Sequence, residues 1–314
     1  MHSESCVERQ VSVRCRGRMP HGLNRRAFLA GTAGLTLPIL SPMCRYGRVL
    51  AEQPELPAHR DLPRLDLHVH LDNSTIDRVL ELSVEREVKF GIVEHAGTKE
   101  NKYPVVLDSD EALRRYLAML EGKPVFRGVQ AEWIDWANCF SIDVLAQLDY
   151  VLMDTMTFPG NDGGRVKLWE PDIAARVDMT DREAFMDRYV DWYVTIIENQ
   201  PIDILGNTSW LPAPLAPDYD KFWTPQRIGK VAAAAVKHRV AFEISSGFQL
   251  PTLGFLQVAK AVGVKFCFGT NGRYPNMGKL DFSLAMAQKL GLKQADLFTP
   301  APDGQKAVQR WSAR

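Results

Sequence analysis

Short apolar, β-branched runs alternate with longer stretches of helical period through the chain after residue 63, and this alternation constrains the fold more than any single motif. A strand followed by a helix, repeated along the chain, predicts parallel strands joined by helical crossovers. We expect an α/β fold whose parallel sheet closes into a barrel. An open doubly wound sheet is the alternative, but the glycine-rich phosphate loop that favours it is absent after the first predicted strand. The seven predicted strands are 65–69, 90–93, 125–129, 150–153, 202–205, 240–244 and 264–268.

Helix start signals fall between these strands. A Ser or Thr whose side chain accepts a hydrogen bond from a backbone N–H of the first turn is a common N-cap. Thr180 is followed by Glu183, which is the spacing of a capping box, and Thr224 is followed by a proline suited to the first helical turn. The expected helix starts are Ser74, Thr180, Thr224, Pro251 and Ser283.

The N-terminal 51 residues differ in composition from the rest. They hold eight Arg and no Lys, and adjacent Arg25 and Arg26 precede a moderately apolar run rich in Gly and Ala. This resembles a twin-arginine export signal, and small residues at 49–51 suit a signal peptidase. We expect a signal peptide over 1–51, a Pro-rich linker over 52–63 and a barrel domain over 64–314. A buried helix behind a basic tail is the alternative.

An exported chain of this kind implies the twin-arginine translocase as a partner and a periplasmic or extracellular location. The apolar run is too short for a stable membrane span, which needs about 20 apolar residues. The chain holds 38 basic and 38 acidic residues, and after residue 51 there remain 30 basic and 36 acidic ones. A nucleic-acid partner is not expected, because such proteins carry a basic excess. Only Cys139 and Cys267 follow the signal, so no disulfide framework is implied.

Polar side chains occur at the end of every predicted strand. In a parallel barrel the functional groups collect at the carboxyl ends of the strands and in the loops that follow. The sequence therefore predicts that one end of the barrel carries the site. The residues in these places are His68, His70, Glu94, His95, Gln130, Glu132, Asp154, Asn207, Glu243, Asn271 and Arg273.

The stretch DLHVHLDN, residues 66–73, suggests a metal site. Residues two apart in a strand point to the same face, so His68 and His70 can offer two imidazoles to one ion. His95 and Glu132 complete the expected ligand set for a single divalent metal such as Zn, Mn or Fe. A metal lowers the pKa of bound water and so produces hydroxide for hydrolysis. A pair of hydrogen-bonded histidines is the alternative, and Glu132 could also be a solvated loop acid.

Six segments resemble, in order, the motifs of the PHP (polymerase and histidinol phosphatase) superfamily. The resemblance runs from about residue 64 to residue 292. It implies a distorted (β/α)7 TIM-like barrel and a metal-dependent hydrolase, most plausibly a phosphoesterase. The segments are LDLHVH at 65–70, FGIVEHAG at 90–97, FRGVQAEW at 126–133, LDYVLMDTM at 148–156, IDILGN at 202–207 and FCFGTNGR at 266–273.

The chain departs from this family at several positions. Gln130 stands where the family usually has a bridging glutamate, and Met156 and Asn207 stand where it has histidines. Asn271 and Arg273 stand where it has an aspartate and a histidine. Neutral amides coordinate such cations less strongly than carboxylates do. A cluster of two or three ions is therefore not expected, and one ion remains the prediction.

Roles for the other strand-end residues follow from their chemistry. Asp154 is a candidate general base or ligand, although an acid at a strand end is often a turn cap, and Glu94 is expected to orient His95. Arg273 suits a phosphate or carboxylate of the substrate, with an ion pair to a nearby acid as the alternative. The expected substrate-binding residues are Gln130, Asn207, Asn271 and Arg165.

Tryptophans also follow the predicted strands. Trp133, Trp136 and Trp210 are expected to line the pocket, whereas Trp192 lies on a helical face and is expected in the core.

The preferred interpretation is an exported metal-dependent hydrolase that acts on a phosphate ester or a related small anionic molecule. A degenerate relative that binds a ligand without turnover is the second interpretation, because several usual ligand positions are substituted. A third is an amidohydrolase or deaminase, because residues 66–87 also resemble the start of adenosine deaminase-type chains. That activity needs an aspartate which the segment TNGR, residues 270–273, does not contain.

Overall fold

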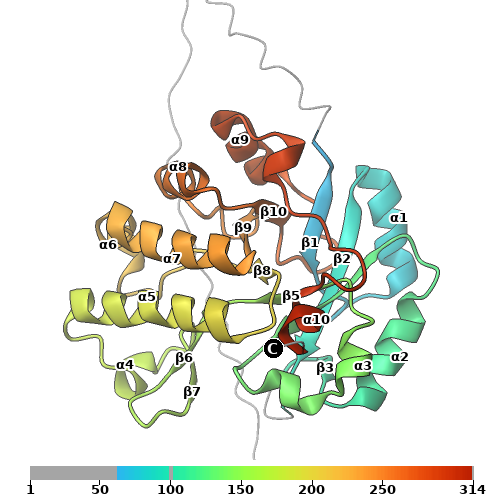
Figure 1. Cartoon of the computed structure of the whole chain (residues 1–314), viewed down its shortest axis with the longest axis horizontal. Coiled ribbons are helices and arrows are strands. Elements are labelled where there is room, and N and C mark those ends of the chain that lie inside the picture. Colours follow the sequence, from blue (N-terminus) through green and yellow to red (C-terminus); the bar gives the residue numbers. More distant parts are fainter. Residues whose placement is uncertain (1–61, 99–101, 313–314) are drawn as a thin grey trace, which may run out of the picture. The chain divides into compact units, whose positions relative to one another are not determined.

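Seven parallel strands form the centre of the protein. The structure is a computed structural model and describes residues 62–98 and 102–312. The expected signal peptide over 1–51 lies outside the described residues, as does most of the expected linker. The order in the sheet is β1-β2-β4-β5-β8-β9-β10, and a short strand β3 pairs with β2 (Figure 1). The strands are β1 Leu65–Val69, β2 Lys89–Ala96, β3 Val106–Leu107, β4 Phe126–Ala131, β5 Tyr150–Met153, β8 Ile204–Leu205, β9 Ala241–Ser245 and β10 Phe266–Gly269.

The first and last strands of this sheet meet. The backbone N–H of His70 donates to the Gly272 carbonyl at 2.9 Å, and the Gly272 N–H donates to the His68 carbonyl at 2.9 Å. The buried Asp66 carboxylate adds bonds from Thr270 and Gly278. We call these contacts the β1–β10 seam. They nearly close the sheet into a barrel, which confirms the expected α/β barrel and excludes the open doubly wound sheet.

Helices lie outside the strands and connect them (Figure 1). An antiparallel hairpin of β6 Thr157–Pro159 and β7 Arg165–Lys167 follows β5. Among the described residues, no helix combines the length and the apolar character that a membrane span requires. The helices are α1 Ile76–Arg86, α2 Asp110–Leu120, α3 Ile142–Leu145, α4 Ile173–Arg176, α5 Arg182–Asn199, α6 Tyr219–Phe222, α7 Pro225–His238, α8 Leu253–Val262, α9 Asp281–Leu290 and α10 Ala307–Ser312.

The helix starts agree with the sequence at some positions and are displaced at others. Thr224 caps α7 as expected, with its side chain accepting from the Arg227 N–H. The α1 cap is Thr75 rather than Ser74, and the α5 cap is Asp181 rather than Thr180. The N–H and hydroxyl of Thr180 both donate to Asp178, and the Asp181 side chain accepts from the Ala184 N–H in its place. Helix α9 begins two residues before Ser283.

The interior of the barrel is filled by side chains from the strands. Tyr150 is the largest of them, and its hydroxyl donates to the Leu67 carbonyl at 2.9 Å. A Cβ at Gly128 would lie 2.6 Å from the Tyr150 ring, so this position has no room for a side chain. A second, larger core packs between the sheet and the helices. The interior residues are Leu67, Val93, Tyr150, Leu152, Ile204, Ala241 and Cys267.

The pairing of β1 with β2 is irregular at the site. The register shifts between Asp66 and Val69, as in a β-bulge. Leu67 belongs to the interior cluster, and the next residue, His68, also bonds to side chains of facing strands. Neighbouring residues of a regular strand point to opposite faces. The irregular pairing therefore explains why the side chains of Leu67 and His68 lie on the same side of β1.

Candidate metal centre

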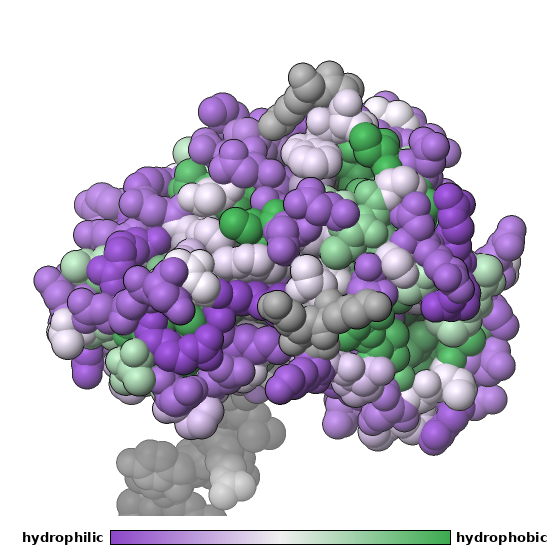
Figure 2. Space-filling view, turned by 90° about the horizontal axis from the view of Figure 1, so that it is seen from below, coloured by the Kyte–Doolittle hydropathy of each residue, from purple (hydrophilic) through white to green (hydrophobic). Residues whose placement is uncertain are grey.

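The expected strand-end residues gather at one end of the barrel. Strand β3 and the β6–β7 hairpin lie along the lower edge of Figure 1, so Figure 2 looks onto this end, which is mainly hydrophilic with separate apolar areas. Buried polar groups in proteins nearly always have partners, so the contacts of each group indicate its role. The buried polar side chains at this end are His68, His70, Glu94, His95, Gln130, Glu132, Asp154, Asn207 and Glu243.

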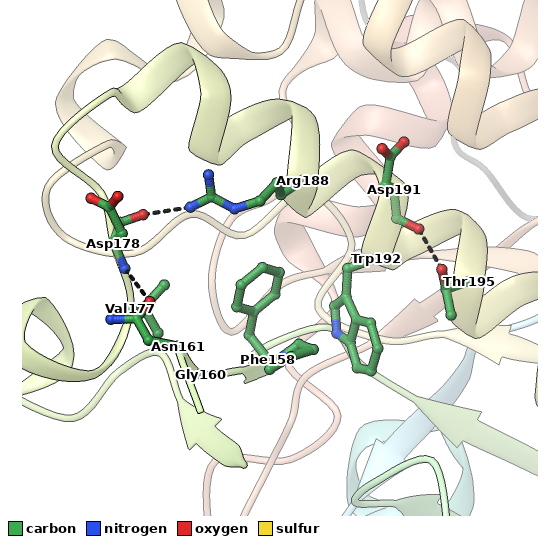
Figure 3. A pocket seen from close by; sticks show the side chains of 10 residues that line it. Phe158, Gly160, Asn161, Val177, Asp178, Arg188, Asp191, Trp192 and Thr195 are labelled. Atoms are coloured by element: carbon green, nitrogen blue, oxygen red, sulfur yellow. Dashed lines mark hydrogen bonds between the residues drawn. The ribbon is translucent and has the colours of Figure 1, made fainter. Parts of the chain in front are cut away.

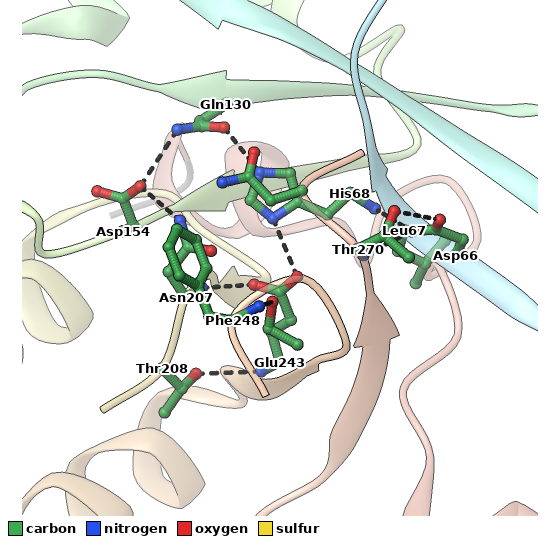
Figure 4. Close-up of polar contacts among 12 residues, drawn as sticks. Asp66, Leu67, His68, Gln130, Asp154, Asn207, Thr208, Glu243, Phe248 and Thr270 are labelled. Atoms are coloured by element: carbon green, nitrogen blue, oxygen red, sulfur yellow. Dashed lines mark hydrogen bonds and ion pairs between the residues drawn. The ribbon is translucent and has the colours of Figure 1, made fainter. Parts of the chain in front are cut away.

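Both ring nitrogens of His68, an expected metal ligand, are engaged by protein side chains. Nδ1 lies 3.0 Å from Oε1 of Glu243, and Nε2 lies 2.9 Å from Oε1 of Gln130. The side-chain amides of Gln130 and Asn207 both donate to Asp154, at 3.2 and 3.0 Å. The Asn207 backbone N–H donates to Glu243 and closes a ring of hydrogen bonds (Figure 4). Both ring nitrogens of His68 thus have protein partners in this structure, and its role as a metal ligand stays a prediction.

The ring also acts on the pKa of His68. Burial is the largest single effect and lowers this pKa, but the charge and hydrogen bond of Glu243, the hydrogen bond of Gln130 and the charge of Asp154 together outweigh it, so the pKa is raised. The ring therefore favours the protonated form of His68.

Several side chains of the described residues have buried atoms without a hydrogen-bond partner, and three of them lie together: both ring nitrogens of His70, Nε2 of His95 and Oδ1 of Asp72. One ligand atom from each of the three residues lies within 4.8 Å of the other two. An ion with bonds of about 2.0–2.2 Å can be shared by groups brought this close. The residues therefore fit a single divalent ion held by two imidazoles and one carboxylate.

The surroundings of the two histidines favour metal binding. Burial lowers the pKa of His70 well below its usual value, and the neighbouring His95, His68 and Arg273 lower it further. His70 is therefore neutral and keeps a lone pair for an ion. Nδ1 of His95 lies 2.6 Å from Oε1 of Glu132, which fixes its ring with Nε2 free. Glu132, expected as a ligand, therefore contacts another expected ligand, His95.

Asp72 is the residue of this group that the sequence reasoning missed. It follows His70 by two positions, as His70 follows His68. Extending the same alternation by one step would have included it among the candidates. Its Oδ2 accepts a hydrogen bond from Nε of Arg273 at 2.9 Å, while its Oδ1 has no partner.

Glu94 is engaged elsewhere. Strand β2 extends to Ala96, so Glu94 and His95 lie within the strand and their side chains point to opposite sides. Oε1 of Glu94 accepts from the Leu71 N–H at 2.7 Å, and its carboxyl lines a different cavity from His95. Burial raises the pKa of Glu94 to about 8. The partner that orients His95 is Glu132, not the expected Glu94.

Tyr103 covers His95, and no signal in the sequence pointed to it. Its ring stacks on the His95 ring with centroids 3.6 Å apart, and the His95 ring stacks on His70 with centroids 4.5 Å apart. The ammonium of Lys167 lies 4.3 Å from the Tyr103 ring centroid, which is the distance of a cation–π contact. The imidazoles are therefore held in a stack of rings.

A cavity of about 340 Å³ lies beside this centre, which we call the strand-end pocket. Arg273 contributes to its wall and is anchored by Asp72 and by the Asn271 side chain, whose Oδ1 lies 2.7 Å from Nη1. The described contacts of the Arg273 guanidinium leave Nη2 for a ligand. Arg165 lies in β7 and is not among the lining residues, which are His95, Tyr103, Gln130, Asp154, Met156, Trp169, Asn207, Trp210, Phe248, Asn271 and Arg273.

Asp154 is the titratable carboxyl of the pocket. Burial and the Glu132 charge raise its pKa, and hydrogen bonds from Asn207 and the Met156 N–H lower it, with a result of about 7. These hydrogen-bond donors all face its oxygens, so the carboxylate form is the one accommodated. A group with this pKa exchanges protons readily near neutral pH.

The aromatic side chains divide between pocket and core. Trp210 lines the pocket as expected, and Trp192 is buried in the core as expected. Trp136 is fully buried and Trp133 packs on Trp192 with ring centroids 5.3 Å apart, so neither lines the pocket. The sequence reasoning missed Trp169 and Phe248, which do.

A larger hollow of about 460 Å³ lies between α5 and the β6–β7 hairpin (Figure 3). Its charged groups are already engaged: Arg188 donates to the Asp178 carbonyl, and Asp191 pairs with Lys230. Unlike the strand-end pocket, it contains no member of the candidate metal group.

Comparison with known proteins identifies the fold. No protein-family model matches the chain, and no curated protein matches it. A solved structure does, with a TM-score of 0.53 and 13% sequence identity, over 79% of this chain and 99% of the other. It is a histidinol phosphate phosphatase from Lactococcus lactis subsp. lactis, complexed with Zn, L-histidinol and phosphate. In fold, the chain resembles this phosphatase. The likeness agrees with the barrel expected from the PHP resemblance, while zinc, histidinol and phosphate belong to that enzyme.

Proposed function

We propose that this chain is a metal-dependent phosphoesterase that acts on a small anionic ester. The observation that carries the proposal is the group of unpartnered, buried ligand atoms on His70, Asp72 and His95 beside a pocket that contains Arg273. The likeness in fold to a zinc-binding phosphatase supports it. A divalent ion such as Zn, Mn or Fe supplies an electrophile there and lowers the pKa of water.

The side chains of the pocket have distinct tasks in this proposal. Arg273 binds phosphoryl oxygens through its remaining N–H groups, because a guanidinium matches this geometry, and Asn271 holds Arg273 in place. Asp154 accepts a proton from the attacking water, for which its pKa near 7 is suited. Gln130 and Asn207 keep the Asp154 carboxylate oriented.

Metal content tests the proposal directly. We expect about one equivalent of metal in the full chain purified without chelator, measured by plasma mass spectrometry, and zinc-dependent hydrolysis of phenyl phosphate. The His70→Ala and His95→Ala variants should lose the metal. His238→Ala is the matched control, because His238 lies at the end of α7 beside Glu198, outside the metal group, and should keep it. A wild-type chain that binds no zinc on titration would contradict the proposal.

Binding without turnover is the second candidate function. The ring of hydrogen bonds favours it, because Gln130 and Asn207 satisfy His68, Asp154 and Glu243 with protein partners alone. The two functions differ in one measurement. A ligand-binding protein would retain phosphate or a phosphonate in calorimetry with metal present, while the hydrolysis of phosphate esters stays at the rate without protein.

We propose further that the chain is exported by the twin-arginine route. The adjacent Arg25 and Arg26 before an apolar run support this, and both lie outside the described residues. Replacement of both by Lys should keep the precursor in the cytoplasm, as seen by fractionation and by mass spectrometry of the N-terminus. Export of the Lys-Lys variant at the wild-type level would contradict this route.

A further inference from the structure

The strand-end pocket is divided according to the strands that supply its residues. At one end the pocket is lined by His95 of β2 and by Arg273, which follows β10 and is held by Asp72 from outside the lining. Large rings come from the loops after β5, β8 and β9, which contribute Trp169, Trp210 and Phe248. Strands β5, β8 and β9 are consecutive in the sheet. Trp169, Trp210 and Phe248 therefore follow neighbouring strands, whereas the other ring of the lining, Tyr103, stacks on His95.

Two of these rings are held in place although they are exposed. Trp169 is 43% and Phe248 is 39% exposed, yet both line the pocket. The backbone before Trp169 is fixed by the Leu168 N–H, which donates to the Met156 carbonyl at 2.8 Å. Phe248 lies in the tight turn that leaves β9 and is drawn beside Asn207 in Figure 4. Exposed apolar surface in a small-molecule pocket is surface that a ligand can cover.

We propose that the substrate is a small ester whose alcohol portion is a planar ring, an aryl or heteroaryl phosphate. Its ring packs against Trp169 and Phe248 while its anionic end meets Arg273. Offset or edge-to-face contacts between aromatic rings add to the gain from burying their area. A cavity of about 340 Å³ is of a size that takes one ring system with its phosphate. The anionic end of this assignment rests on the proposed function, and the ring end does not.

Calorimetry with two non-hydrolysable probes tests the ring end separately from catalysis. We expect phenylphosphonate to bind the zinc-loaded full chain at least about tenfold more tightly than methylphosphonate, which is about 1.4 kcal/mol. Trp169→Ala and Phe248→Ala should remove most of this preference and leave methylphosphonate binding unchanged, and Trp169→Phe should keep it. Trp311→Ala is the matched control, because Trp311 is 38% exposed on α10, outside the pocket.

The outcomes separate this inference from the proposed function. Equal affinity for the two phosphonates, or an equal loss for both in Trp169→Ala, overturns the ring assignment. Hydrolysis of phenyl phosphate and ethyl phosphate with the same kcat/KM also overturns it and leaves the phosphoesterase intact. A preference for phenylphosphonate that depends on Trp169, without hydrolysis of either ester, supports the ring assignment and contradicts the proposed phosphoesterase activity.

Discussion

His68 and His70 are two residues apart in the chain, and their surroundings give them opposite tasks. His68 is hydrogen-bonded through both ring nitrogens, to Glu243 and Gln130, and its pKa is raised, whereas burial lowers the pKa of His70 well below its usual value. The motif DLHVHLDN predicted two equivalent ligands. The difference arises from Gln130 and Glu243, which lie 62 and 175 residues away, so no local pattern could reveal it.

Substitution should separate the two histidines. We expect His70→Ala to lower zinc affinity at least about a hundredfold, because ligand loss should exceed the 10–100-fold cost of losing an outer partner. His68→Ala should instead lower the free energy of unfolding by about 3–5 kcal/mol, because it leaves the Glu243 carboxylate buried and unpaired. Zinc calorimetry and urea unfolding of the metal-free proteins measure the two effects. A His68 variant of wild-type stability that fails to bind zinc would restore His68 as a ligand.

Asp154 should control the pH dependence of hydrolysis. Its carboxylate form accepts the proton, so the rate should rise with pH and level off above a pKa of about 7. Asp154→Asn should lower kcat by about 10²–10⁴ and remove this rise, because the amide does not accept a proton. The check is kcat from pH 5 to pH 9 with phenyl phosphate. The same rise in the Asn variant would assign the titration to another group.

Elements were predictable where a local signal decides them. Strands β1 and β5 begin and end at the predicted residues, because short β-branched runs flanked by polar residues are local features. The expected strand 90–93 is in fact β2, Lys89–Ala96, because the polar Glu94 and His95 continue the pairing with β4. The displaced cap of α5 lies next to Thr180, whose hydroxyl is engaged by Asp178, while nothing in the structure explains why Thr75 rather than Ser74 caps α1.

A glycine inside the sheet should be less replaceable than one on a helix. Gly128→Ala should lower the free energy of unfolding by about 1–3 kcal/mol, because the added Cβ overlaps the Tyr150 ring in a packed interior. Gly229→Ala in α7 is the control: nothing lies within 4 Å of the added Cβ, and alanine should stabilise the helix by about 0.5–1 kcal/mol. Denaturant unfolding at neutral pH measures both. Equal effects would mean that Tyr150 moves aside without cost.

The whole molecule shows which predictions need the tertiary structure. The barrel followed from the alternation of strands and helices, a property of the entire chain that survives errors at single boundaries. The partners of the expected ligands did not follow, because they depend on side chains across the barrel and on the irregular pairing near Asp66. Trp169 was missed because it follows the β6–β7 hairpin, which was not predicted.

The stability of the molecule should depend on pH through Asp203. This carboxyl accepts from the Val151 and Ala307 N–H groups and so links β5 to the start of α10. Burial raises its pKa from 3.8 to about 6. The folded state then holds a proton that the unfolded state has lost between these pH values. The contribution of Asp203 to the free energy of unfolding is therefore greatest in acid. It falls by about 3 kcal/mol as the pH rises to about 6 and then stays constant.

Asp203→Asn tests this sign. Position 203 of the variant does not titrate. Its free energy of unfolding should therefore increase by about 2–3 kcal/mol relative to that of the wild type between pH 4.5 and pH 7. Other buried acids such as Asp66 are present in both proteins and cancel in the comparison. Urea unfolding curves at several pH values provide the measurement. Parallel stability curves for the two proteins would show that Asp203 does not titrate in this window.

The β1–β10 seam has a consequence for the order in which the protein is made. The three candidate ligands are all synthesised early, at residues 70, 72 and 95, whereas Gly272, which pairs with the backbone of His68 and His70, is among the last residues of the barrel to leave the ribosome. Glu243, which holds His68, also comes late. For most of translation, a nascent chain therefore contains its proposed metal-binding motif but lacks Glu243 and Gly272, which contact that motif in the folded protein. The site is assembled only when the chain is nearly complete.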